Sequence, residues 1–193
     1  MQAKYDRTTR WLHAALACGV VVQLALSAVM HVPPGPGLGT NDWHRKAFEL
    51  HAKVGPWVGF IVALHWLWLL LPQSRPGLSY LFPWASAETR RVLFAELESL
   101  VRLRIPPPAA GSPLVGTVHG LGLAAVTGSA MCGITLYLGY FVGIAIPRPI
   151  LHGVALAHLT FGFLMWTFVI AHGSMALVHW IARPASQGLA SDR

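Results

Sequence analysis

Four long apolar runs constrain this chain more than any other feature. A helix that crosses a bilayer needs roughly 20 predominantly apolar residues. Four segments are long enough, at about 9–31, 48–71, 115–142 and 150–181. Of the 193 residues, 54% are hydrophobic and 11% are charged, whereas soluble domains carry about a quarter charged residues. The sequence therefore predicts an all-α fold, a membrane-embedded four-helix bundle, with 1–193 as a single domain.

The longest connection, between spans two and three, predicts an amphipathic helix. Its stretch "SAETRRVLFAELESLVRLRI" places Leu93, Leu97, Leu100 and Val101 on one helical face, with charged residues opposite. This pattern is typical of a helix that lies at the membrane interface; a solvated connector helix is the alternative. The first apolar run exceeds the 7–15 residues of a signal-peptide core, so we expect it to be retained. Residues 182–193 are expected to form a polar tail.

The distribution of basic residues predicts the orientation. One side of the predicted bundle carries ten Lys and Arg residues and the other carries four. By the positive-inside rule, both termini are predicted to be cytoplasmic, in a bacterial inner membrane. The ten are Lys4, Arg7, Arg10, Arg75, Arg90, Arg91, Arg102, Arg104, Arg183 and Arg193; the four are Arg45, Lys46, Lys53 and Arg148.

Composition also excludes several classes of protein. Cys18 and Cys132 lie inside apolar runs, so they offer no disulfide framework, and no C-x-x-C-H motif for c-type haem is present. The net charge of +7 comes from basic residues that flank the apolar segments and form no stripe. We therefore expect contact with membrane lipid and no binding of nucleic acid.

Two histidines of the fourth span carry the strongest functional signal. Ionisable groups inside membrane spans are usually functional and face the bundle interior. His158 and His172 are fourteen positions apart, which is within about 40° of whole helical turns and a rise of roughly 21 Å. They therefore share one face, one near each membrane surface. Neutral imidazole is a favoured ligand of haem iron, and two stacked haems would require this arrangement. Each haem needs a second imidazole at matching depth.

The spacing does not determine which histidine pairs with His172. On the periplasmic side the partner is His51, near the start of span two. On the cytoplasmic side His13 of span one competes with His65, which follows His51 by fourteen residues. Geometry alone allows either to face His172.

A set of short motifs, taken in order, resembles the bacterial cytochrome b561 family. "KYDRTTRWLH" is similar to its opening Arg-x-x-His, and "LHAKVG" to its second-span His-x-x-x-Gly. "VHGLGLAAVTGSAMCG" is similar to its third span, although a proline common before the last glycine is absent. The matching positions are Arg10, His13, His51, Gly55, His119, Gly133, His158 and His172.

The resemblance implies a bundle that holds two haem b groups, ligated by His51–His158 and His13–His172. Cytochrome b subunits of hydrogenases and formate dehydrogenases share this scheme. His65 is the departure, and a His65–His172 pair, as in the cytochrome b of quinol-oxidising bc complexes, is the alternative.

Other polar residues are expected to support the haems. Arg7 and Arg10 lie where propionates of the cytoplasmic haem should emerge, and Lys53 could play that role on the other side. His119 is a candidate contact for a quinone carbonyl or a haem propionate, or makes a structural hydrogen bond. Near the span ends, where polar side chains reach the interface, no ligand role is expected for His31, His44, His152 and His179.

Bis-histidine ligation leaves no open iron position, which predicts electron transfer and not oxygen binding. The resemblance implies the quinone pool as one terminus. The protein is then a stand-alone oxidoreductase, or the membrane anchor of a dehydrogenase or hydrogenase that exchanges electrons with a periplasmic or cytoplasmic protein. The third class, a haem-free transporter or scaffold, predicts histidines scattered in angle and depth.

Overall fold

The computed structural model describes residues 5–30, 42–74, 77–102 and 111–188, and within them it is helical without strands. Four helices are long and apolar enough to cross a membrane, which confirms the predicted fold class. They are α1 (Arg7–Val29), α2 (Asp42–Leu69), α5 (Pro113–Tyr137) with the π-helical turn η2 (Leu138–Val142), and α6 (Arg148–Gly188).

Two helix ends differ from the predicted spans. α2 begins at Asp42, six residues before the expected start of its span, and α6 continues to Gly188, into the segment expected to be a polar tail. The predicted bounds of each span come from its apolar residues alone. A helix that has already formed can extend by further residues at little cost in free energy. Polar turns therefore extend these helices beyond their apolar parts.

The start of α1 is tied to the end of α2. Asp6 caps α1, since its carboxylate accepts a hydrogen bond from the Thr9 backbone N–H at 2.7 Å. The indole N–H of Trp68, near the end of α2, donates to the Thr9 hydroxyl at 3.0 Å. These bonds fix the position of the first turns of α1, which carry Arg10 and His13.

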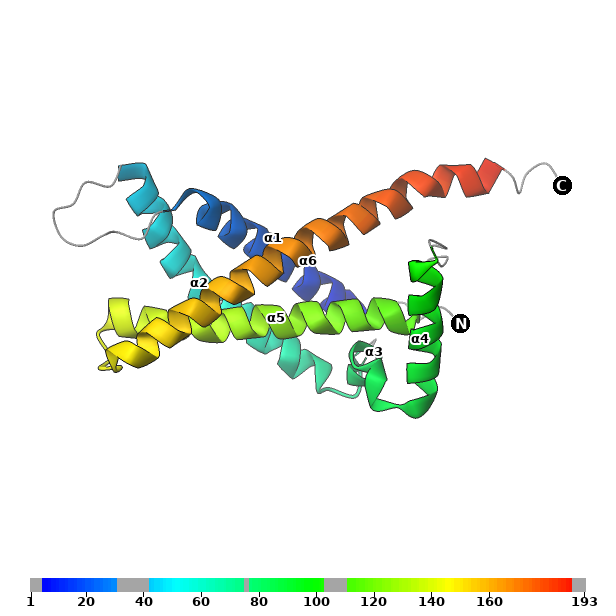
Figure 1. Ribbon diagram of the computed structural model, residues 1–193, viewed down its shortest axis with the longest axis horizontal. Helices are drawn as coiled ribbons and strands as arrows, with labels where there is room; N and C mark the ends of the chain where they lie inside the picture. The colour runs from blue at the N-terminus through cyan, green and yellow to red at the C-terminus, as the bar shows by residue number, and fades with distance from the viewer. Residues whose placement is uncertain (1–4, 31–41, 75–76, 103–110, 189–193) are drawn as a thin grey trace.

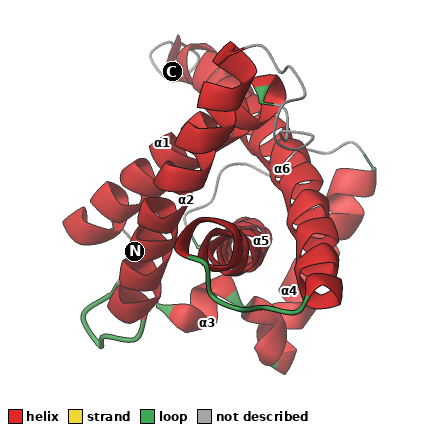
Figure 2. Ribbon diagram, turned by 90° about the vertical axis from the view of Figure 1, so that its left-hand side faces the viewer, coloured by secondary structure: helices red, strands yellow, loops and turns green. Residues whose placement is uncertain are grey.

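The four long helices are joined in the order α1, α2, α5, α6. Extensive contacts connect α1 with α2, α2 with α5, and α5 with α6 (Figure 1). Figure 2 shows α5 end-on between the α1–α2 pair and α6. The side between α1 and α6 has no comparable helix contact. Within the described residues, this is therefore the less closely packed side of the bundle.

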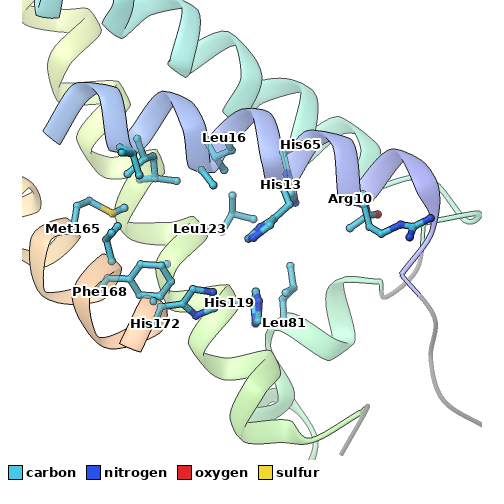
Figure 3. A pocket seen from close by; sticks show the side chains of 18 of the residues that line it. Arg10, His13, Leu16, His65, Leu81, His119, Leu123, Met165, Phe168 and His172 are labelled. Atoms are coloured by element: carbon cyan, nitrogen blue, oxygen red, sulfur yellow. The ribbon is translucent and has the colours of Figure 1, made fainter. Parts of the chain in front are cut away.

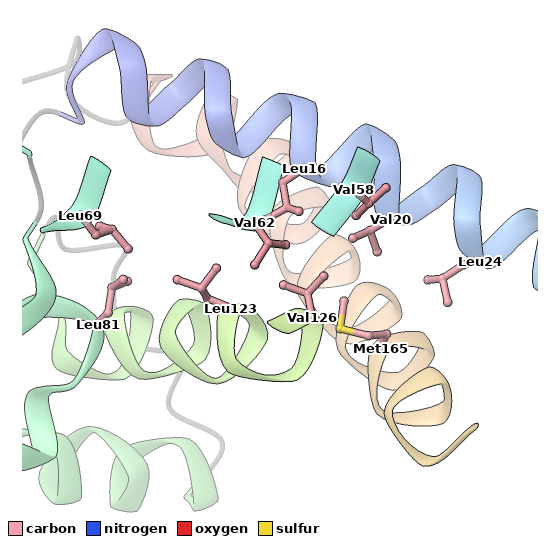
Figure 4. Close-up of a cluster of buried hydrophobic side chains, with 10 residues drawn as sticks. All are labelled: Leu16, Val20, Leu24, Val58, Val62, Leu69, Leu81, Leu123, Val126 and Met165. Carbon is pink, nitrogen blue, oxygen red and sulfur yellow. The ribbon is translucent and has the colours of Figure 1, made fainter. Parts of the chain in front are cut away.

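The hydrophobic core is a narrow strip along the shared faces of these helices (Figure 4). Its buried members are Leu16, Val20, Leu24, Val58, Val62, Leu69, Leu81, Leu123, Val126 and Met165. Most other apolar side chains of the spans point outward, and at most 28% of any apolar window is buried in the chain. Lipid is the solvent that suits such a surface.

Part of the long connection packs directly on α5. The short helix α3 (Leu78–Leu81) and the 3₁₀ turn η1 (Pro83–Ala85) follow α2. A Cβ on Gly116 would clash with the Tyr80 carbonyl oxygen, and one on Gly120 with that of Leu81. The G-x-x-x-G pattern of α5 therefore serves close contact between backbones within the chain.

The predicted amphipathic helix is α4 (Ala87–Val101). Leu93 is buried, whereas Val101 is 84% exposed and Leu97 is 38% exposed. The Glu96 carboxylate accepts hydrogen bonds from the Ser112 hydroxyl at 2.8 Å and the Leu114 N–H at 2.9 Å. α4 is therefore anchored to the first turn of α5, with much of its apolar face uncovered.

Candidate functional site: two imidazole pairs

The first pair joins α2 and α6. The ring centres of His51 and His158 lie 6.1 Å apart, with the rings nearly perpendicular at 78°. The Nδ1–H of His51 donates to the Gln23 carbonyl at 3.2 Å, and that of His158 to the Ser129 carbonyl at 3.0 Å. A carbonyl can only accept, so each ring keeps its lone pair at Nε2. This is the usual state of an imidazole that binds a metal.

Close packing supports this pair from behind. A Cβ added to Gly133 would lie 3.1 Å from the His158 ring, so a larger residue would crowd that ring. The side-chain amide of Gln23 donates to the His51 carbonyl at 3.1 Å, and its nitrogen lies 3.1 Å from where a Cβ on Gly55 would be. The glycines of the second-span and third-span motifs thus make room beside the two histidines.

The second pair lies at the end of the bundle where α1 begins, here called the N-terminal end. The ring centres of His13 and His172 are 6.5 Å apart, at an angle of 68°. The His172 ring also stacks on Phe168, with 5.2 Å between ring centres and 10° between planes. His13 comes from α1 and His172 from α6, so the pair joins two helices that have few backbone contacts with each other among the described residues.

A cavity of about 730 Å³ opens between these two rings. Figure 3 shows His13, His119 and His172 pointing into it from α1, α5 and α6. Its walls are mostly apolar and include Leu16, Leu123 and Met165. Ligand sites in proteins typically have volumes of about 300–1,000 Å³ with few polar groups. The cavity therefore has the size and lining of a cofactor site.

Two further histidines line this cavity. The His119 ring centre is 6.0 Å from that of His13 and 5.1 Å from that of His172. His65 is 7% exposed, and its Nδ1 is buried without a hydrogen-bond partner in the part of the chain that the structure describes. Unpaired buried polar atoms are rare in proteins. A polar group from outside the chain would supply the missing hydrogen-bond partner of His65 Nδ1.

The three basic residues predicted to contact haem propionates differ in their position relative to the cavity. Arg10 lines the cavity beside His13, whereas Arg7 is exposed outside its lining. Lys53 is exposed, two residues after His51. Tyr5 lines the cavity, and its hydroxyl lies 3.4 Å from that of Tyr80. Burial, followed by the hydrogen bond to Tyr5, raises the pKa of Tyr80.

Two other histidines, His44 and His152, are absent from the two imidazole pairs and from the cavity lining of the described residues. His44 and His152 lie in the first turns of α2 and α6, with His152 exposed. His31 and the His179 side chain lie outside what the structure describes, as do Lys4, Arg75 and Arg104. No ligand role was expected for these histidines.

The pair geometry fits a haem. Metal–imidazole bonds are roughly 2.0–2.1 Å long and the nitrogen lies about 1 Å from its ring centre, so two imidazoles on opposite sides of one metal have ring centres about 6 Å apart. The observed 6.1 and 6.5 Å agree with this value. Among the described residues no cluster of three or more His, Cys, Asp or Glu side chains could hold a metal ion. A porphyrin iron needs only two protein ligands.

Sequence reasoning missed two contributors to the site. Gln23 contacts His51 through both its backbone and its side chain, but a glutamine in an apolar run has no distinctive pattern. Leu81, from the connection between spans, lines the cavity at the N-terminal end. The G-x-x-x-G at Gly116 and Gly120 was the available signal for that docking.

These features define a class of protein: a four-helix membrane protein with paired imidazoles in its interior. The chain matches the family model described as prokaryotic cytochrome b561 over residues 4–187, and it belongs to that family. It is therefore a multi-pass inner-membrane haem b protein of electron transfer. Searches of curated proteins and of solved structures gave no match.

Proposed function

We propose that this protein binds two haem b groups, one between His51 and His158 and one between His13 and His172, and carries electrons across the membrane. The two ring separations of 6.1 and 6.5 Å, at opposite ends of one helix face, carry this proposal. The fourteen residues between His158 and His172 correspond to a rise of roughly 21 Å along α6. Such a separation favours one site near each membrane surface.

His13 is the better partner of His172 than His65. The His172 ring contacts His13, His119 and Phe168, and no ring contact with His65 is found among the described residues. His65 instead lies buried in the wall of the cavity, with Nδ1 available to donate or accept a hydrogen bond. We assign it to the surroundings of the haem and not to the iron.

The side chains around each pair have distinct roles. Haem iron with two imidazole ligands accepts and releases single electrons and has no open position for oxygen. The Gln23 and Ser129 carbonyls orient His51 and His158, and stacking on Phe168 orients His172. Arg10 lines the cavity, and we assign its guanidinium to a haem propionate. To Arg7 and Lys53, which are both exposed, we assign a weaker, solvent-screened attraction to the propionates.

Quinone is the proposed electron partner within the membrane, with both termini in the cytoplasm. The excess of basic residues at the N-terminal end supports this orientation. α4, with Leu97 and Val101 exposed, suits a position at the membrane interface. Reduction of the haems by a quinol in the isolated chain would support a stand-alone oxidoreductase. Purification with a tightly bound larger subunit would support an anchor role.

Haem counting with matched variants tests the ligand assignment. The intact protein should give two b haems per chain by pyridine haemochrome, both low-spin in the oxidised state. His13→Ala should lose one low-spin haem, whereas His65→Ala should keep both. A colourless protein refutes haem binding, and loss in His65→Ala instead of His13→Ala refutes the proposed pair.

A further inference from the structure

α4 is fixed across the end of α5 at which α5 begins. Figure 1 shows the two helices crossing there. Leu93 of α4 is buried, and the Glu96 carboxylate accepts hydrogen bonds from the first turn of α5 and the residue that caps it. α5 is one of the four helices long and apolar enough to cross a membrane. A helix fixed in this way would lie along the membrane surface, which is the position proposed for α4 above.

An uncovered apolar stripe runs along α4. Phe94, Leu97 and Val101 follow one another at three- and four-residue spacings, so they lie on one side of the helix. These residues are 66%, 38% and 84% exposed. On a bilayer, such a stripe is buried at the boundary between headgroups and acyl chains. Polar residues next to the stripe would then lie at the level of the headgroups.

Two arginines lie at the start of this stripe. Arg90 and Arg91 are exposed and precede Phe94 by one helical turn. The Arg90 guanidinium donates to the Trp84 carbonyl at 3.1 Å, which ties it to η1. Trp84 itself is 36% exposed, and tryptophan is enriched at membrane–water interfaces. Two cations, an indole and an apolar stripe therefore lie next to one another at this end of α4.

The positive charge of these two arginines is not cancelled by the carboxylates of α4. Glu98 pairs with Arg102 at the other end of the helix, and Glu96 is held at the start of α5. Glu88 is exposed, and no ion pair joins it to either arginine within the described parts of the chain. A guanidinium can bind two oxygens of one phosphate through parallel N–H bonds. The two arginines thus suit an anionic phosphate.

We infer that Arg90 and Arg91 bind the phosphate of an anionic phospholipid at the membrane surface, with Trp84 and the apolar stripe in the interface beside it. This inference rests on the proposed interfacial position of α4. Phosphatidylglycerol carries a net negative charge, whereas the ammonium of phosphatidylcholine cancels the charge of its phosphate. A basic residue at a membrane surface attracts anionic lipid strongly enough to raise its binding roughly fivefold.

Fluorescence quenching in lipid nanodiscs tests this inference. The full-length protein carries a fluorophore at Ala87→Cys, four residues before Arg91, with Cys18 and Cys132 replaced. The nanodiscs consist of phosphatidylcholine with a small fraction of phosphatidylglycerol or phosphatidylcholine that bears a nitroxide on an acyl chain near the headgroup. Labelled phosphatidylglycerol should quench more strongly. Arg91→Gln should lower this preference roughly fivefold, and Arg90→Gln/Arg91→Gln should lower it further.

Arg102→Gln is the matched control. It removes one positive charge at the other end of α4, where Arg102 already pairs with Glu98, so the preference should not change. A loss equal to that of Arg91→Gln would show that overall charge attracts the lipid, and would overturn the inference. Arg91→Gln is the decisive single variant, because replacing Arg90 also removes the bond to the Trp84 carbonyl.

The same measurement separates this inference from the proposed function. Equal quenching by the two labelled lipids, with both arginines present, refutes this inference alone. No quenching by either lipid would place the start of α4 away from the membrane, and would refute its proposed interfacial position as well. The haem count of each variant should equal that of the original protein, because none of the substituted arginines lines the cavity. A lower count would show that these arginines support the bundle itself, and would overturn the inference.

Discussion

Gln23 and His51 are joined by two hydrogen bonds between α1 and α2. The His51 Nδ1–H donates to the Gln23 carbonyl, and the Gln23 amide donates back to the His51 carbonyl at 3.1 Å. One contact orients the ring and the other fixes the backbone that carries it. Gln23 is therefore a positioning residue for the predicted ligand His51.

Gln23→Leu should shift the spectrum of one haem only. The side-chain bond is lost while the carbonyl contact remains, and the buried Gln23 Oε1, which has no partner among the described residues, is removed with it. Stability should therefore change by less than about 1 kcal/mol. The His51 ring should reorient enough to move the g-values of its haem. The haem at the N-terminal end provides the internal control, and equal shifts in both haems would contradict a local role.

Gly120→Ala should disturb the N-terminal end of the bundle. A Cβ there clashes with the backbone oxygen of Leu81, which cannot move alone, and Leu81 lines the cavity. We expect a loss of roughly 1–3 kcal/mol in stability, typical of overpacking. Thermal unfolding in detergent measures it, and the spectrum of the His13 haem should change with it.

Gly153→Ala is the matched control. A Cβ at this position meets no atom within 4 Å. Alanine favours a helix over glycine by about 1 kcal/mol, so this variant should be as stable as the original protein or slightly more so. Comparable destabilisation of both variants would show that α3 docking on α5 is not the cause.

Glu96→Gln should loosen α4 from α5. The carboxylate accepts from Ser112 and from the Leu114 N–H at the α5 N-terminus, where negative charge is favourable. Removing the charge should cost about 1 kcal/mol and speed proteolysis between α4 and α5. Glu98→Gln is the control, because the Glu98 side chain is 63% exposed and pairs with exposed Arg102. It should have little effect.

Spin labels on α4 should report its position relative to the membrane. In a background with Cys18 and Cys132 replaced, labels at 97 and 101 should be more accessible to oxygen than to a polar relaxation agent. A label at 88, on the charged face, should show the reverse. Equal accessibility of all three sites to the polar agent would favour a solvated connector helix.

The spacing of the two histidines on α6 could be predicted from sequence because it depends on one helix only. His158 and His172 lie on one continuous helix, so their shared face follows from the pitch alone. The four spans could be predicted for a similar reason: lipid requires each helix to satisfy its own backbone bonds and to present apolar side chains. Pairing between helices is different, because it depends on how rigid helices pack.

The choice between His13 and His65 shows that difference most clearly. Both lie at suitable depth in the sequence, and the motif resemblance, not the spacing, favoured His13. Only the packing of α1, α2, α5 and α6 brings His13 within 6.5 Å of His172 and leaves His65 in the cavity wall. The approach of His119 to both rings also depends on that packing. Helix periodicity determines on which face of its own helix a side chain lies. The packing of the helices against one another determines which other side chains it contacts.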